Sequence, residues 1–198
     1  MQYETLTFKE FVPLATRTES VLDSVKVDKE LLTAMLRVGV EAGDVLDVLK
    51  KSVFYKKPEK FDGNIHETLN SLRNSVSATI ATLPAEKPST ALSGSAAVNV
   101  DPRVLHAVIG KFTEASELLA AVLKSINSGN PIDVVNLAEE LGDDEWYDAV
   151  LTDATGIDKS VSRARVINKL SIRYPEKFTT ENAITRNLEA EREALEGR

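Results

Sequence analysis

The chain of 198 residues carries 24 Lys and Arg against 31 Asp and Glu, a formal net charge of −7, with two histidines and no cysteine. Without cysteine there are no disulfides, thiolate zinc sites or cysteine nucleophiles, and two histidines cannot build a His-rich metal site. A bound metal would need mostly oxygen ligands, which favours Mg²⁺, Mn²⁺ or Ca²⁺. The acidic balance also argues against nucleic acid polymers as partners, because their binding proteins present a basic face.

Helical periodicity dominates the chain, and glycine and proline are few, with 9 and 7 residues. Since no stretch alternates with period two for long enough to form a sheet, we predict an all-α fold. The predicted helices span residues 29–51, 65–83, 102–128, 133–152, 158–173 and 180–196.

The helix beginning at Pro102 has the clearest signals, because Asp101 is a favourable N-cap and proline is common in a first turn. Gly129 is the expected C-cap, and Asn130–Pro131 is the expected start of the next helix. A continuous apolar stripe runs along the first of these helices: Leu105, Val108, Ile109, Phe112, Leu119, Leu123 and Ile126.

Residues 84–100 are rich in proline, serine and alanine and are the predicted linker between residues 1–83 and 101–198. A shift of 73 residues places Glu41-Ala42 on Glu114-Ala115 and keeps the apolar register. This indicates an internal duplication, with a partly degenerate first copy and both copies expected in one antiparallel helical bundle.

The first eleven residues include two acids and no apolar run, so no signal peptide is expected. No stretch approaches the roughly 18 apolar residues of a membrane span. We therefore expect a soluble, cytoplasmic protein that has no membrane partner.

Two acidic pairs flank the Gly129 turn, Glu114 with Glu117 and Glu140 with Asp143. Residues three apart share a helix face, so each pair forms a patch of two carboxylates. The midpoint of residues 114 and 143 lies between residues 128 and 129, and so does the midpoint of residues 117 and 140. In an antiparallel hairpin with its turn at this point, the two acidic pairs would therefore lie at the same height. Four converging carboxylates would repel one another unless a divalent cation bound between them.

A solvated acidic face is the alternative for the first pair, which projects roughly opposite the apolar stripe. The second helix is apolar around most of its circumference, and its polar residues share one narrow wedge: Asn136, Glu140, Asp143 and Tyr147. Acids on such a helix are costly unless they are paired or bind metal. The two pairs together favour a metal site.

These residues also carry a family resemblance. The motif Glu114-Ala-Ser-Glu117, followed by Glu139-Glu140-Leu-Gly-Asp143 and Trp146-Tyr147, resembles the MazG-like all-α nucleoside triphosphate pyrophosphohydrolases. The tail Asn168-Lys169-Leu170-x-x-Arg173-Tyr174-Pro175-x-x-Phe178 is similar to that of phage-type members. The resemblance covers residues 104–178 and extends more weakly upstream to about residue 31.

The resemblance implies Mg²⁺-dependent cleavage of an NTP or dNTP into a monophosphate and pyrophosphate, with Mn²⁺ as an alternative ion. Glu114, Glu117, Glu140 and Asp143 would be the metal-binding and catalytic residues. Further substrate contacts would come from Asn168, Lys169, Arg173 and Trp146. Solvated positions at the helix end are the alternative for the first three, and a core position is the alternative for Trp146.

The upstream copy keeps one acidic pair, Glu41 and Asp44. If the turn of this copy lies near residues 60–61, the positions opposite Glu41 and Asp44 in a hairpin are Ile80 and Ser77. Neither is acidic, so this copy lacks a second acidic pair. Its basic segment, residues 50–57, resembles the segment after the first family motif and would lend lysines to substrate phosphates, or it is an exposed charge run without a role.

Two other functions remain open from the sequence. One is a non-catalytic helical interaction protein, and the other is an alarmone ((p)ppGpp) hydrolase of the same fold. Members of the resembling family commonly assemble as dimers or tetramers, which makes a homodimer one expected assembly. The duplication would alternatively let one chain supply both halves of a bundle.

Overall fold

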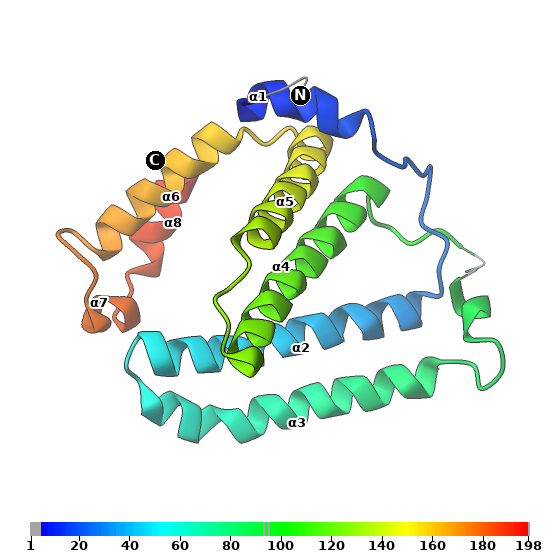
Figure 1. Cartoon of the computed structure of the whole chain (residues 1–198), viewed down its shortest axis with the longest axis horizontal. Helices are drawn as coiled ribbons and strands as arrows, with labels where there is room; N and C mark the ends of the chain where they lie inside the picture. Colours follow the sequence, from blue (N-terminus) through cyan, green and yellow to red (C-terminus); the bar gives the residue numbers. More distant parts are fainter. Residues whose placement is uncertain (1–4, 93, 95, 198) are drawn as a thin grey trace. The chain divides into compact units, whose positions relative to one another are not determined.

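The computed structural model describes residues 5–92, 94 and 96–197, and these residues contain helices and no strands, as predicted (Figure 1). In chain order the elements are α1 (Phe8–Thr16), α2 (Lys29–Phe54), α3 (Pro58–Thr82), the 3₁₀ helix η1 (Pro88–Leu92), α4 (Pro102–Ser128), α5 (Val134–Thr155), α6 (Lys159–Arg173), α7 (Thr180–Ile184) and α8 (Leu188–Glu196).

The helices form two compact units, each built from two separate stretches of the chain. Unit 1 comprises Met1–Val25 and Val98–Asp158 and contains α1, α4 and α5. Unit 2 comprises Lys26–Ala97 and Lys159–Arg198 and contains the remaining helices. The C-terminal helices thus share a unit with α2 and α3, whereas the boundaries predicted from sequence follow chain order.

Unit 1 is built on the antiparallel α4–α5 hairpin (Figure 1). The Asp101 carboxylate accepts the N–H groups of Arg103 and Val104 at 2.8 and 3.2 Å, which confirms the predicted N-cap. Gly129 ends α4 with φ of 70°, a left-handed conformation in which glycine avoids the strain of a side chain. Local signals therefore fix both ends of α4.

The N-cap and first turn predicted at Asn130–Pro131 are wrong, whereas the predicted helical range, which begins at residue 133, agrees with the structure to within one residue at its start. The cap is Asp133, whose carboxylate accepts the N–H groups of Val135 and Asn136 at 3.0 and 3.2 Å. Two capping bonds from one side chain satisfy donors that the first helical turn would otherwise leave free. The helix α5 consequently begins at Val134 and continues to Gly156, its left-handed C-cap.

Helix α1, which was not predicted from the sequence, packs on α5. It opens with a capping box in which Thr7 and Glu10 exchange hydrogen bonds. The buried apolar positions of unit 1 are small or of moderate size: Ala15, Ala107, Ala149 and Val150. Small residues at these positions allow the helices to approach closely.

The apolar stripe of α4 lies largely outside this core. Its members from Val108 to Ile126 are 39 to 71% exposed. The side of α4 that packs against α5 instead carries Ala107, Gly110 and Glu114. The helix therefore buries its face of small and acidic residues, although hydrophobicity alone favours the opposite face.

Unit 2 contains a second hairpin, α2–α3 (Figure 1). Its turn spans Tyr55–Lys57, so the expected turn near residues 60–61 is wrong, and α3 starts at Pro58 rather than at residue 65. Proline suits this first position because its missing N–H would have no partner there. Asp28 caps α2 through the N–H of Leu31 at 2.8 Å.

The capping aspartates of the two hairpins match the proposed duplication. Asp28 precedes α2 and Asp101 precedes α4, and their numbers differ by 73. The two helices also have nearly equal lengths, 26 and 27 residues. The equivalence of the hairpins remains a prediction, to which the matched caps add a further correspondence.

The single helix predicted for residues 180–196 is wrong, because the structure divides it into α7 and α8. The side chain of Asn187 accepts the N–H of Ala190 at 3.1 Å and thereby starts a new helix. Helix α8 packs on α6, where buried Glu191 binds both Arg173 and Arg186 at 2.5 and 2.6 Å. An ionic cluster therefore anchors α8 inside unit 2.

Within the described part of the chain, no helix combines the length and apolar character needed to cross a membrane.

Candidate metal centre

The seam between α4 and α5 positions the acidic side chains. Gly110 lies under the Tyr147 ring, and a Cβ at residue 110 would fall within 3.0 Å of that ring, a separation that real Cβ atoms essentially never show. The midpoint of residues 110 and 147 lies between Ser128 and Gly129, and the midpoint of residues 114 and 143 lies at the same place. The hairpin thus has the register that the acidic spacing predicted.

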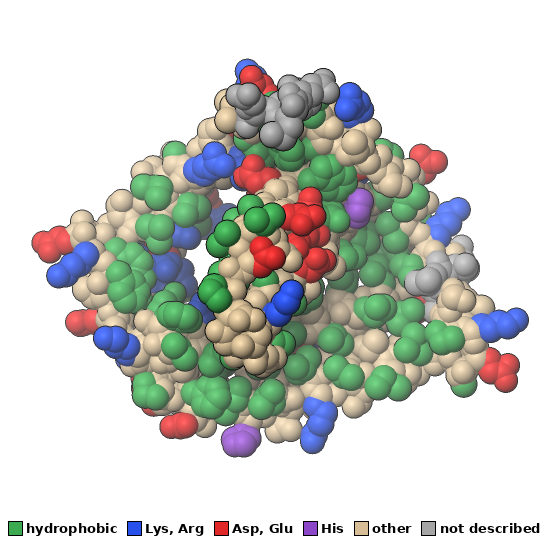
Figure 2. Space-filling model, viewed as in Figure 1, with side chains coloured by type: hydrophobic (Ala, Val, Ile, Leu, Met, Phe, Trp, Pro, Cys, Tyr) green, Lys and Arg blue, Asp and Glu red, His purple; other side chains and the backbone are tan. Residues whose placement is uncertain are grey.

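Three carboxylates converge across this seam, Glu114 from α4 with Glu140 and Asp143 from α5. One oxygen from each lies within 4.8 Å of the others. Glu114 and Glu140 are only 8 and 7% exposed, whereas Asp143 is exposed. Acidic side chains also gather over α4 and α5 in the space-filling view (Figure 2). The cluster therefore has two buried members and one that solvent reaches.

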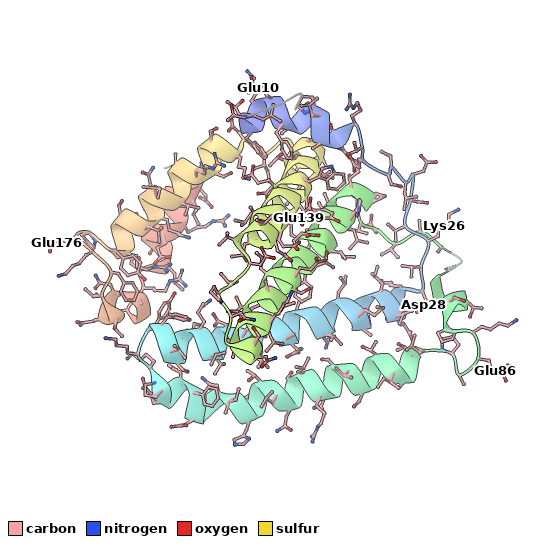
Figure 3. The ribbon with its side chains drawn as sticks, viewed as in Figure 1. Glu10, Lys26, Asp28, Glu86, Glu139 and Glu176 are labelled. Carbon is pink, nitrogen blue, oxygen red and sulfur yellow. The ribbon has the colours of Figure 1, made fainter. Side chains whose placement is uncertain are left out.

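An amide holds one of the buried carboxylates. Asn136 donates its Nδ2–H to Glu140 Oε1 at 2.6 Å. Glu139, the next residue along α5, is exposed (Figure 3). The helix thus separates two adjacent glutamates, one oriented within the cluster and one in solvent.

The electrostatics of the cluster favour a cation. Burial raises the pKa of Glu114, and the negative charges of Glu117 and Asp143 raise it further. Burial also raises the pKa of Tyr147, with contributions from the charges of Glu114 and Asp143. Negative charge therefore accumulates where it is incompletely solvated, and a bound cation would relieve the repulsion.

Other acids on α5 already have a cationic partner. Lys111 on α4 binds Asp144 at 2.7 Å and Asp148 at 3.0 Å. Among the residues that the structure describes, none forms an ion pair with the three clustered carboxylates. The hairpin thus neutralises one group of acids and leaves the other available to a ligand.

The spacing of the three carboxylates suits a divalent ion. Two oxygens bound to Mg²⁺ at about 2.1 Å lie at most roughly 4.2 Å apart, and the limit for Ca²⁺ is roughly 5 Å. The 4.8 Å grouping is on this scale, so small side-chain rotations would bring all three oxygens into one coordination sphere. An all-oxygen donor set is also what hard cations prefer.

The fourth predicted ligand, Glu117, does not belong to the group of three. It is exposed, one turn beyond Glu114 on α4. Its charge nevertheless raises the pKa of both Glu114 and Tyr147, which places it near the cluster. The structure therefore brings three of the four predicted carboxylates together and leaves the fourth beside them.

Trp146 packs against α1 and against Thr18, two residues beyond the end of that helix. Its indole N–H lies 3.1 Å from the carbonyl of Ala15 and 2.9 Å from the Thr18 hydroxyl, and both accept from it. Its ring meets those of His106 and Tyr147 edge-on, with centroids 5.8 and 5.0 Å apart. In this structure the indole fastens α1 to α5.

The other predicted substrate residues lie on α6 in unit 2. Asn168 is exposed and Lys169 is half-buried. Arg173 forms the ion pair with Glu191 and lies over the Tyr174 ring, 5.8 Å from its centroid. Its guanidinium thus contributes to the packing of α6 on α8.

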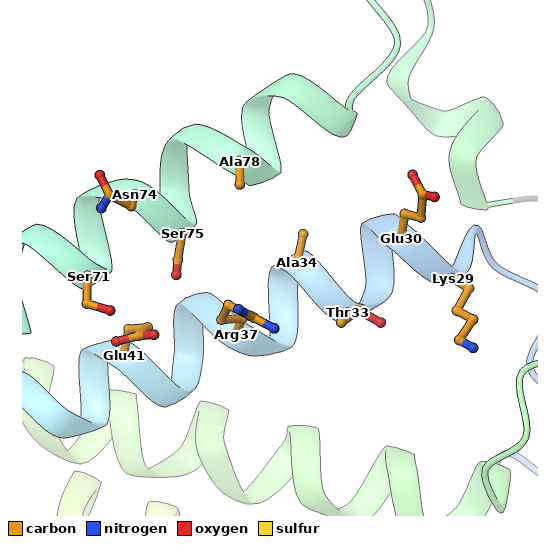
Figure 4. A pocket seen from close by; sticks show the side chains of 10 residues that line it. All are labelled: Lys29, Glu30, Thr33, Ala34, Arg37, Glu41, Ser71, Asn74, Ser75 and Ala78. Atoms are coloured by element: carbon orange, nitrogen blue, oxygen red, sulfur yellow. The ribbon is translucent and has the colours of Figure 1, made fainter.

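The upstream acidic pair lies on α2. Glu41 faces Ser71 across a groove of about 670 Å³ between α2 and α3 (Figure 4). Because the turn is centred on residue 56, the positions opposite Glu41 and Asp44 are Ser71 and Thr68. The sequence had instead predicted Ile80 and Ser77 as the opposite positions. The partners change, but neither is acidic, so α3 still supplies no second acidic pair opposite Glu41 and Asp44.

Two contacts of the hairpin were not predicted from the sequence, although the residue spacing allows both. Asn136 and Glu140 were placed on one helix face, but the hydrogen bond that their spacing of four residues permits was not predicted. Asp144 and Asp148 are also four apart and together bind Lys111. Which acids pair with a lysine and which are left to a ligand emerges only when α4 and α5 are assembled.

Comparisons with family models, with curated proteins and with solved structures find no match to this chain.

Proposed function

We propose that the protein is a Mg²⁺-dependent nucleotide pyrophosphohydrolase that cleaves an NTP or dNTP between the α and β phosphates. The observation that carries the proposal is the convergence of Glu114, Glu140 and Asp143, whose oxygens lie within 4.8 Å of one another. The substrate class rests on the resemblance of the acidic motifs and the tail to MazG-like pyrophosphohydrolases. Mn²⁺ is the alternative ion, because it accepts the same oxygen ligands.

The residues in and beside the cluster have three parts in the proposed mechanism. Glu114, Glu140 and Asp143 would hold the cation, and Asn136 would fix the orientation of the Glu140 carboxylate through its 2.6 Å hydrogen bond. Glu117 would complete the negative surface from one turn away. The cation would neutralise the triphosphate, orient it and activate the attacking water.

The negative charge of the cluster makes a cation necessary for an anionic substrate at this site. The cluster is formed by carboxylates in a chain that carries −7, so a bare triphosphate would be repelled from it. A divalent ion held by the three carboxylates would turn this repulsion into attraction. Activity without a divalent cation would therefore contradict the proposal.

The test compares two neighbouring glutamates. Glu140→Ala should lower Mg²⁺-dependent release of pyrophosphate by roughly a hundredfold or more, since even residues behind metal ligands alter activity by about 10–100-fold. Glu139→Ala makes the same substitution at the neighbouring glutamate, which is exposed, and should leave turnover near that of the unsubstituted protein. Full activity in Glu140→Ala would overturn the assignment.

The substrate panel for this experiment should contain canonical and modified NTPs, dNTPs and alarmones, with products separated as monophosphate plus pyrophosphate or otherwise. An alarmone hydrolase would share the metal chemistry and differ only in the nucleotide that is consumed. If no member of the panel is turned over with Mg²⁺ or Mn²⁺, the pyrophosphohydrolase proposal is wrong.

A second candidate function is a helical interaction protein, and the exposed stripe of α4 favours it. Phe112, Leu123 and Ile126 are 51, 57 and 71% exposed, whereas burial of such side chains would stabilise an assembly. A homodimer would be the simplest partner. Light scattering of the intact chain, together with melting curves with and without Mg²⁺, separates assembly from metal binding.

A further inference from the structure

Unit 2 contains a second pocket with a composition opposite to that of the acidic cluster. It has a volume of about 300 Å³ and lies among the end of α2, the start of α3, and α7 with the segment that follows it. Four cationic side chains line it together with one carboxylate: Lys51, Lys57, Lys60, Arg186 and Asp47. In a chain with a net charge of −7, this is a local excess of positive charge.

The acids near this pocket do not neutralise it. Asp47 is shared between Lys50 and Lys51, and Glu191 is shared between Arg173 and Arg186. Each of these carboxylates thus balances only one of the two cations that it contacts.

The two lysines at the start of α3 are weakly paired or unpaired. Lys57 is 3.7 Å from Glu59, a long ion pair to a glutamate that is 62% exposed. Within the described residues Lys60 forms no ion pair. Positive charge therefore remains available on the side of the pocket formed by α3.

We propose that this pocket binds a compact, multiply charged phosphate anion such as pyrophosphate. Arg186 binds Glu191 through Nε and Nη2, so it would offer its remaining N–H groups to phosphate oxygens, and the lysines add point charges from several directions. The volume is at the low end of the range of about 300–1,000 Å³ for ligand pockets, which favours a small anion over a whole nucleotide.

The proposal goes beyond hydrolysis and does not depend on it. All lining residues belong to unit 2, and the pocket includes none of the clustered carboxylates of unit 1. Binding should therefore need no divalent cation. The phosphate could belong to free pyrophosphate or to the tail of a nucleotide, and the two arms of the test separate these sources.

The test is calorimetric titration of the intact protein with inorganic pyrophosphate in EDTA at low, fixed ionic strength. We expect Lys57→Gln/Lys60→Gln to weaken binding roughly tenfold or more, because each charge-assisted contact contributes substantially. Lys57 makes no capping hydrogen bond through its side chain, so this substitution does not remove a helix cap. Circular dichroism confirms that each variant is folded.

The matched control is Lys26→Gln/Lys177→Gln, which removes two positive charges from exposed lysines outside the pocket. It should bind pyrophosphate within about twofold of the unsubstituted protein. Equal weakening in both double variants would show a general charge effect and would overturn the proposal. So would the absence of binding by the unsubstituted protein at millimolar pyrophosphate.

A third variant separates this proposal from the hydrolase. Glu140→Ala should bind pyrophosphate in EDTA unchanged even where its Mg²⁺-dependent activity is lost. A parallel titration with ATP identifies the source: tighter binding of ATP that is also lost in Lys57→Gln/Lys60→Gln indicates a nucleotide tail. Dependence of binding on Glu140 instead of on the two lysines would refute the basic site.

Discussion

The ring of Tyr147 lies directly over Gly110, with no room for a Cβ between the two helices. Glu114 lies four residues after Gly110 on α4, and Asp143 lies four residues before Tyr147 on α5. Residues four apart share a helix face, so the close contact and the carboxylates are successive layers of one seam. The spacing of α4 and α5 at this contact thus governs how closely the acids approach.

Gly110→Ala should therefore destabilise the protein by about 1–3 kcal/mol, the usual cost of overpacking a tight contact. It should also weaken Mg²⁺ binding, because the new methyl group displaces the Tyr147 ring and separates the helices. Urea unfolding and Mg²⁺ titration measure the two effects.

Gly142→Ala provides the matched control, since a Cβ at residue 142 meets nothing within 4 Å. Here alanine should stabilise the helix by up to about 1 kcal/mol, because glycine is unfavourable within a helix. A loss of stability at residue 142 equal to that at residue 110 would mean that the contact with Tyr147 is not the cause.

Removal of one buried charge should stabilise the metal-free protein. Burial and neighbouring charges raise the pKa of Glu114, so its ionised form is unfavourable without a cation. In EDTA, Glu114→Gln should melt at a higher temperature than the unsubstituted protein. With Mg²⁺ the order should reverse, because a bound ligand adds about 2.7 kcal/mol at a hundredfold excess over its Kd.

Glu139→Gln is the control for that experiment, because it removes an exposed charge from the neighbouring helix. It should retain the rise in melting temperature that Mg²⁺ causes. If Glu114→Gln retained the same rise, Glu114 would not be a ligand.

The ionic cluster on α8 should make the stability of the folded protein depend on pH in the acidic range. The ion pairs with Arg173 and Arg186 lower the pKa of Glu191 to about 2, below its ordinary value of 4.5. The folded state thus binds fewer protons than the unfolded state, so this contribution is complete above about pH 4.5 and is lost as the pH falls toward 2.

Urea unfolding at several pH values from 6 to 3 measures this contribution. Glu191→Gln should lower stability at pH 6 and flatten the dependence on pH. The neighbouring exposed acid in the first turn of α8 supplies the comparison, and Glu189→Gln should leave the curve nearly unchanged. Parallel curves for Glu191→Gln and the unsubstituted protein would contradict the prediction.

The one tryptophan of the chain should report on the attachment of α1. Trp146→Phe removes a donor that faces Ala15 and Thr18 and should cost about 1–3 kcal/mol. Thr18→Val keeps the indole but removes one acceptor, so it should shift the tryptophan emission with a smaller loss. Unchanged emission and stability in Thr18→Val would show that this hydrogen bond contributes little.

The sequence predicted features that depend on local chemistry. Asp101 and Gly129 were identified as the ends of α4 because a capping carboxylate and a left-handed glycine act within a few residues. The division near Asn187 and the cap at Asp133 were missed, since several polar residues there could have capped a helix. Competing local signals are resolved by the packing of the whole unit.

The burial of Glu114 could not be read from hydrophobicity. A stripe of large apolar residues marks the opposite side of α4, yet Ala107 and Gly110 allow the nearest approach of α5. The acidic spacing did predict the register, because residue numbers alone determine height in a hairpin. Which side faces the partner helix depends on the fit between Gly110 and Tyr147, which no single-helix pattern contains.

Because unit 1 joins two distant stretches of chain, its assembly must wait during translation. The indole of Trp146 and its acceptor in α1 are 131 residues apart. At about 5–20 residues per second, a ribosome needs on the order of ten seconds to add them. Throughout that interval the nascent α1 has no α5 to pack on, while the intervening α2–α3 hairpin is already emerging.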